Sequence, residues 1–145
     1  MRDLVIHVTN EPGALAKVAA AVSDAGVNLA AATYVGDGAD LHILVKHAEP
    51  TRRVLEPAGI TVGDEREVVV IQAEDRPGVL ADLARKVADA GVNLDLVYVA
   101  TSTRIVFGAE DMAALRAALG VEEEQPAYPP AADQSEVDVE AGSLL

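Results

Sequence analysis

The sequence repeats itself at an offset of 65 residues, and this repeat constrains the fold more than any other feature. Residues 10–29 and 75–94 agree at 12 of 20 positions. The shared positions run from a Pro-Gly pair, at Pro12 and Pro77, to a Gly-Val-Asn-Leu ending. A fixed-period repeat indicates that one supersecondary unit has been duplicated. The 145 residues, which by length alone suggest one domain, are therefore predicted to form two small ones.

The spacing of apolar residues predicts the same order of elements, β-α-β-β-α-β, in each repeat. The predicted strands of the first repeat are residues 4–8, 27–35, 41–46 and 60–62, and its helices follow the Pro-Gly turn and Pro50. The predicted strands of the second repeat are residues 68–73, 92–100 and 104–107, with a weak last strand at 121–124, and its helices carry the apolar stripes of residues 80–87 and 112–119.

This order predicts an α+β fold of two tandem ferredoxin-like sandwiches, each with an antiparallel sheet and both helices on one face. Residues 1–65 and 66–124 would be the domains, joined by a short connection at residues 63–67. The strand after the first helix lies at a sheet edge in this topology, and a long apolar edge strand invites pairing with another edge. We therefore expect the two domains, or two chains of a homodimer, to join their sheets through residues 27–35 and 92–100.

The net charge of −13 is unevenly distributed along the chain. Residues 121–145 hold seven acids and no Lys or Arg, whereas the rest holds 17 acids and 11 bases. Residues 125–145 have the composition of a disordered acidic tail. The mildly acidic body argues against nucleic acid as a partner.

Several classes of site and location are disfavoured by composition. The chain has no cysteine, which excludes disulfides and thiolate metal sites. His7, His42 and His47 are scattered, so we expect no metal and no cofactor. No apolar run approaches the roughly 20 residues of a membrane span, and a strand begins at once after Met1. We therefore expect a cytoplasmic protein without a membrane partner.

The two Pro-Gly turns are the strongest candidates for a binding feature. Pro suits the first turn of a helix, and Asn10 or Asp75 could cap its free N–H groups. Gly13 and Gly78 have no Cβ, so another group could approach the backbone. The free N–H groups and the helix dipole favour an anion there. An ordinary helix start without any ligand fits the same pattern.

Taken together, the strand, the Asp-x-Pro-Gly-x-Leu turn, the helix ending in Ala-Gly-Val-Asn and the next strand resemble the ACT domain, a small regulatory module that binds amino acids. Residues 68–119 carry the resemblance through Asp75, Pro77, Gly78, Leu80, Gly91 and Asn93. Residues 4–62 carry it with Asn10 in place of the Asp. Residues 91–95 and 101–105 also resemble the regulatory region of aspartate kinases, although these 145 residues hold no kinase domain. The resemblance implies an effector held between paired ACT domains, beside the Pro-Gly turn and the Asn that begins the second strand.

The chemistry of a free amino acid fits this placement. Its carboxylate suits the backbone N–H groups of residues 13–15 or 78–80, and its ammonium suits carbonyl oxygens or the side chains of Asn28, Asn93 or Asp75. The candidate ligand-binding residues are Asn10, Gly13, Ala14, Leu15, Asn28, Asp75, Gly78, Val79, Leu80 and Asn93. Asn28 and Asn93 fit a simple turn after glycine equally well. The apolar neighbours of the turns favour a small or medium neutral amino acid.

The interpretation that explains most of these features is a non-enzymatic amino-acid sensor or regulatory subunit. The alternative is a structural adaptor that binds a partner, such as a metabolic enzyme, through its sheet edges without a small ligand. An acylphosphatase-like hydrolase would need a basic anion-binding loop, which is not found. An RNA-recognition module needs exposed aromatic residues and a basic face, whereas the chain has one Phe, three Tyr and an acidic balance. Residues 101–103 fit a turn better than a nucleophile, because no base is near them in sequence.

Overall fold

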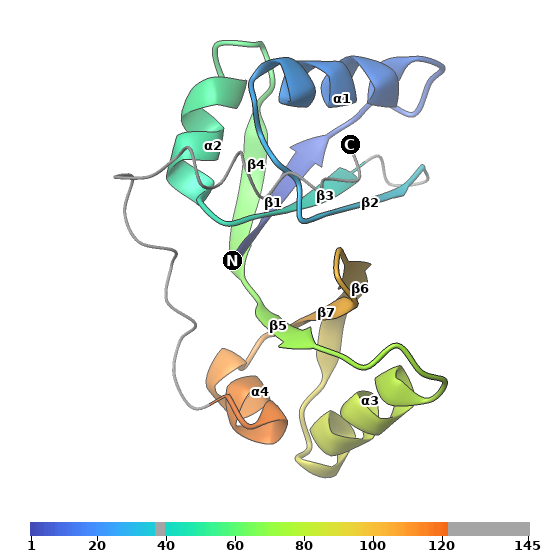
Figure 1. The fold of residues 1–145 in the computed structure, drawn as a ribbon. Coiled ribbons are helices and arrows are strands. Elements are labelled where there is room, and N and C mark those ends of the chain that lie inside the picture. The colour runs from blue at the N-terminus through green and yellow to red at the C-terminus, as the bar shows by residue number, and fades with distance from the viewer. Residues whose placement is uncertain (37–39, 122–145) are drawn as a thin grey trace. The chain divides into compact units, whose positions relative to one another are not determined.

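The computed structural model describes residues 1–36 and 40–121, and these divide into two compact units (Figure 1). The first unit comprises residues 2–66, and the second begins at residue 67 and includes Met1. Each unit combines a sheet with two helices, which confirms the α+β class.

The first unit has the element order that the sequence predicted, with a four-stranded sheet. Its elements are β1 (Arg2–His7), α1 (Ala14–Asp24), β2 (Ala31–Val35), β3 (Asp40–Val45), α2 (Ala48–Leu55) and β4 (Val62–Glu67). The strands lie in the order β2-β3-β1-β4, so β2 is an edge strand as predicted. Leu4 pairs with Ile43 and Ile6 with Leu41. These side chains share one face and form a core with Val22 of α1, and Leu55 of α2 belongs to the same core.

The second unit repeats this plan with three described strands. Its elements are β5 (Val69–Gln72), α3 (Val79–Asp89), β6 (Leu94–Ala100), β7 (Arg104–Ala109) and α4 (Met112–Leu119). The strand order is β5-β7-β6, so β6 is also an edge strand as predicted. Its core is built around Phe107, with Val87 of α3 and Leu115 of α4. The weak last strand predicted at residues 121–124 lies outside the described residues except for Val121, which is not in a strand.

The predicted start of β2 was wrong, because residues 27–30 are not in a strand. The Val27 N–H completes the end of α1 by donating to the carbonyl of Val22 at 3.2 Å. Ala30 donates to the carbonyl of Leu44 at 2.9 Å, just before regular pairing begins. Residues 27–30, which were predicted to be strand from their apolar character, therefore follow the helix and complete its end instead.

The predicted connection at residues 63–67 was also wrong, because these residues belong to β4. Arg52 holds this polar strand, since its guanidinium donates to the carbonyls of Val62 at 3.1 Å and Gly63 at 3.0 Å. Glu65 pairs with Arg2 at 2.9 Å. A charged edge strand is a common protection against unwanted pairing, and its composition resembles that of a loop.

The helix α2 begins at Ala48, two residues before the predicted start at Pro50. Pro50 is its third residue. The first N–H groups of a helix have no acceptor within the helix, so a proline there breaks no helical hydrogen bond. The helix can therefore extend back to its N-cap, His47.

Candidate ligand-binding site

The two Pro-Gly turns have nearly the same backbone geometry. Gly13 and Gly78 are the N-caps of α1 and α3, with φ of 85° and 88°. Neither helix has a side-chain hydrogen bond at its N-cap. The prediction that Asn10 and Asp75 cap these helices was wrong, because the left-handed glycine sets the helix start three residues after the proposed caps.

Backbone conformation, more than crowding, explains the glycine at these positions. A Cβ at Gly13 would meet nothing within 4 Å, and one at Gly78 would meet only the Arg76 guanidinium, at 3.8 Å. L side chains rarely adopt φ near +85°. The surface in front of both helix starts is therefore open, and Leu15 and Leu80 beside them are 39% and 44% exposed.

The charges around the two turns are different. Arg76 donates to Asp82 at 2.9 Å, to Glu74 at 3.0 Å and to the carbonyl of Pro77 at 3.2 Å. Its hydrogen bonds with Asp82 and Glu74 raise the pKa of Arg76. The position equivalent to Arg76 in the first repeat is Glu11. The position equivalent to Asp82 is Lys17, so Glu11 and Lys17 leave the first turn without net charge, whereas Glu74, Asp75 and Asp82 outnumber Arg76 at the second. The first turn is therefore the less unfavourable of the two for an anion.

Asn28 and Asn93 lie after the opposite ends of the helices from the Pro-Gly turns. Helix α1 has 11 residues, which at about 1.5 Å per residue separates its ends by about 16 Å. The structure therefore does not bring Gly13 and Asn28 together within one unit. Asn10 instead lies against Gly36, where an added Cβ would be 3.1 Å from its Oδ1.

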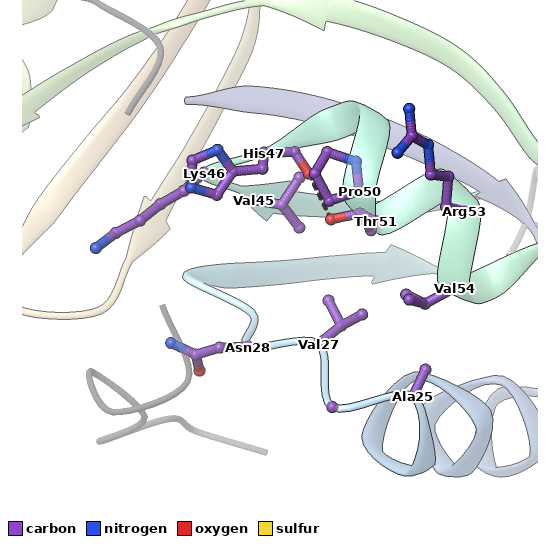
Figure 2. Close-up of a pocket in the computed structure, with 11 residues that line it drawn as sticks. Ala25, Val27, Asn28, Val45, Lys46, His47, Pro50, Thr51, Arg53 and Val54 are labelled. Atoms are coloured by element: carbon purple, nitrogen blue, oxygen red, sulfur yellow. Dashed lines mark hydrogen bonds between the residues drawn. The ribbon is translucent and has the colours of Figure 1, made fainter. Parts of the chain in front are cut away.

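A pocket of about 350 Å³ lies in the first unit, between the end of α1 and the start of α2 (Figure 2). Of the predicted site residues only Asn28 lines it, and the Oδ1 of Asn28 is buried without a hydrogen-bond partner. The apolar part of the lining is formed by Ala25, Val27, Val45, Pro50 and Val54. The remaining lining residues are Gly26, Asn28, Lys46, His47, Thr51 and Arg53.

The polar part of this pocket includes two cations, Lys46 and Arg53. None of its 11 lining residues is acidic. Burial lowers the pKa of His47, and the charge of Lys46 lowers it further. The Thr51 hydroxyl donates to the carbonyl of His47 at 2.6 Å, which fixes the start of α2. Sequence reasoning missed Lys46, His47 and Arg53, because nothing in their local pattern marks them as neighbours of residues 25–28.

The other predictions about sites concern histidines and metals. His42 hydrogen-bonds through Nδ1 to the fully buried Asp3, at 2.8 Å from its Oδ2. Within residues 1–36 and 40–121, no group of three His, Cys, Asp or Glu side chains could hold a metal ion. No helix in the described part of the chain is long and apolar enough to cross a membrane.

Comparison with known proteins identifies the second repeat. Residues 68–124 match the sequence profile of the ACT domain, as their resemblance predicted. The match does not extend to the first repeat. No curated protein matches the chain.

Several solved structures share the fold over most of the chain. Protein BT0572 from Bacteroides thetaiotaomicron has a TM-score of 0.71 at 22% identity, over 82% of this chain and 85% of its own. The regulatory subunit of aspartate kinase from Thermus flavus has a TM-score of 0.53 at 24% identity, over 84% and 92%. That from Thermus thermophilus, in its ligand-free form, has a TM-score of 0.56 at 21% identity, over 83% and 88%. At these identities the similarity establishes the fold alone.

Proposed function

We propose that this chain is a non-enzymatic regulatory protein made of two ACT-like domains, residues 1–65 and 66–124. It binds an amino-acid effector at an interface between paired ACT domains, near the Pro-Gly turns. The profile match of the second repeat supports this proposal. The repeated sequence, the strand order of the first unit and the fold shared with aspartate kinase regulatory subunits support its extension to the first repeat.

The observation that carries the proposal is the open start of α1 and α3. Both helices begin at a left-handed glycine without a side-chain cap, although the N–H of Ala14 already donates to the Glu11 carbonyl at 3.3 Å. The first N–H groups of a helix have no partner within the helix, and the positive end of the helix dipole lies at the same place. A ligand carboxylate supplies both the missing acceptors and the negative charge.

The edge strand β6 favours association of this chain with a second copy, which would pair the ACT-like domains that bind the effector. Val97 and Val99 of β6 pair with Phe107 and Ile105, which lie in the core. Directly paired residues share a face, so both valines lie on the face that the helices cover. They are nevertheless 40% and 65% exposed. We propose that a second chain covers them in a homodimer.

The same surface also supports the alternative function, an adaptor that needs no small ligand. Exposed valines on an edge strand suit the sheet edge of a partner enzyme as well as that of a second copy. Amino-acid binding separates the two functions, because the adaptor predicts none.

A thermal-shift screen of the full chain against the twenty amino acids tests the proposed function. A ligand at about 100 times its Kd stabilises the fold by about 2.7 kcal/mol, which raises Tm by several degrees. Isothermal titration calorimetry then gives the Kd of each hit. If no amino acid changes Tm and calorimetry detects no binding, the sensor is refuted and the adaptor is favoured.

A further inference from the structure

We propose that the pocket of the first unit is a second ligand site, which takes a small neutral molecule with an aliphatic body and an amide group. It is separate from the amino-acid site of the proposed function, because it lies at the opposite end of α1 from Gly13. Its volume of about 350 Å³ lies within the range of about 300–1,000 Å³ that is common for small-molecule sites.

The feature that points to a ligand is the side-chain amide of Asn28, which lines the pocket. Its Oδ1 is buried without a hydrogen-bond partner, and no other buried side-chain oxygen or nitrogen in residues 1–36 and 40–121 shares this condition. Native structures seldom leave such a group unpaired, because a buried acceptor without a donor destabilises the folded state. The oxygen therefore calls for a donor from a molecule other than this chain.

The amide of Asn28 also determines which group it recognises. The residue follows Val27 in the connection between α1 and β2 (Figure 2). The terminal torsion of an asparagine side chain is broad, so rotation of the amide can turn either polar atom toward the pocket. Because Oδ1 accepts and Nδ2 donates, the complementary group carries a donor beside an acceptor. An amide has both and can pair with Asn28 through two hydrogen bonds.

The rest of the lining favours a neutral ligand with a hydrocarbon part. The apolar side chains that line the pocket are those of Ala25, Val27, Val45, Pro50 and Val54. Such a surface gains free energy by covering the hydrocarbon part of a ligand. A charged group is costly to bring into apolar surroundings unless it is paired, whereas an amide needs only hydrogen bonds. The charge of Arg53 is already paired with Glu49 at 3.2 Å.

The second repeat provides an internal comparison. The residue equivalent to Asn28 is Asn93, which is exposed and so can bond to water. Aligning the N-caps of α2 and α4 places Leu115 at the position of Thr51. Leu115 is fully buried in the core of the second unit. The smaller threonine leaves more room beside α2 than the leucine leaves beside α4, so the first unit is the one suited to a ligand at this place.

Nuclear magnetic resonance of the full chain tests this site with 4-methylpentanamide as the probe. We expect the backbone amide signals of residues 25–28 and 45–54 to shift on titration, together with the side-chain NH2 signals of Asn28. The matched probe is 5-methylhexan-2-one, in which a methyl group replaces the NH2 of the amide. Because the ketone cannot donate to Oδ1, it should bind at least tenfold more weakly. Equal affinity for amide and ketone refutes the site, and so does the absence of shifts at these residues, since a water molecule would then be the donor.

Variants of the lining test the same contacts from the side of the protein. Asn28→Leu should weaken 4-methylpentanamide binding at least tenfold, and its Tm should stay the same or rise, because the substitution removes an unpaired buried acceptor. If this variant does not fold, Val54→Ala gives a second test with an expected loss of about threefold. Its matched control is Val35→Ala, at a position that is 68% exposed and outside the lining, which should not change the affinity. Wild-type affinity in folded Asn28→Leu or in Val54→Ala refutes the site.

The amino acid leucine separates this site from that of the proposed function. Leucine has the same branched end as the probe but carries two charges in place of the amide, so it should bind at least tenfold more weakly at residues 25–28 and 45–54. Equal or tighter binding of leucine there would refute a neutral ligand. The substitution Leu80→Glu should leave 4-methylpentanamide binding unchanged, so failure here is distinguishable from failure of the proposed amino-acid site.

Discussion

A carboxylate placed at the start of α3 should compete with the carboxylate of the effector. Leu80 is the second residue of α3 and is 44% exposed, so Leu80→Glu can be made without opening the core. The new charge would lie beside the N–H groups that we assign to the ligand. Two like charges about 6 Å apart, at an effective dielectric constant of about 40, repel by about 1.4 kcal/mol. That energy corresponds to about a tenfold loss of affinity.

Stability should change in the opposite direction from binding. An acid in the first turn of a helix stabilises it by about 0.3–1 kcal/mol, so Tm should stay the same or rise slightly. Leu80→Gln is the matched control, since glutamine has nearly the same shape as glutamate without the charge. Arg76 does not offset the new carboxylate fully, because Glu74 and Asp82 already bind it.

Calorimetry with the amino acid found by screening measures the effect at low and high salt. Repulsion between exposed charges is screened by salt, so the affinity difference between Leu80→Glu and Leu80→Gln should shrink at about 1 M salt. Equal affinity of the two variants at low salt would refute the placement of an anion at this turn. Leu15→Glu applies the same test to the first repeat, whose turn carries Glu11 and Lys17.

Four further predictions follow from single features. Gly78→Val should lower the stability by about 1–2 kcal/mol, measured by denaturant unfolding, because φ of 88° is strained for a side chain; the unstrained Leu80→Gln should not. Burial and Lys46 lower the pKa of His47 below its usual 6.5; the unfolded chain therefore binds more protons, and stability should fall as pH drops below about 6.5, a dependence that Asn or Gln at this position should reduce. Sedimentation should show a dimer that Val99→Lys dissociates, whereas a monomeric wild type would contradict the edge pairing. A chain ending at Gln125 should keep its Tm and its amino-acid affinity, and a loss of several degrees would show that the acidic tail stabilises the body.

The sequence predicted the parts of the fold that depend on local periodicity. The spacing of Leu80, Leu83 and Val87 on a helix face and the glycine after each helix were enough to locate α3 and its end. The strand order then followed from the element order, and with it the edge positions of β2 and β6. The fourth strand was predicted at residues 60–62 but β4 covers Val62–Glu67, because Arg52 and Arg2 stabilise residues that have no strand pattern of their own.

The sites were less predictable than the fold, for two physical reasons. The cap assignment for Asp75 failed, because a left-handed glycine after proline delays the helix start. The sequence did not predict the pocket, because packing brings Val27 and Val54, which both line it, together across an intervening hairpin. Lys46 and His47, which also line the pocket, carry no motif.

The unequal charges of the two Pro-Gly turns limit how steeply the proposed homodimeric sensor could respond to an amino acid. Glu74, Asp75 and Asp82 outnumber Arg76 at the second turn, whereas Lys17 offsets Glu11 at the first, which favours one stronger anion site in each chain. A homodimer then holds two equivalent sites related by its twofold axis. Since the Hill coefficient of a symmetric oligomer cannot exceed its number of sites, the effector response of the dimer has an upper limit of two. Asp75→Asn and Asp82→Lys, which give the second turn the residues of the first, would double the number of strong sites, and with it that limit.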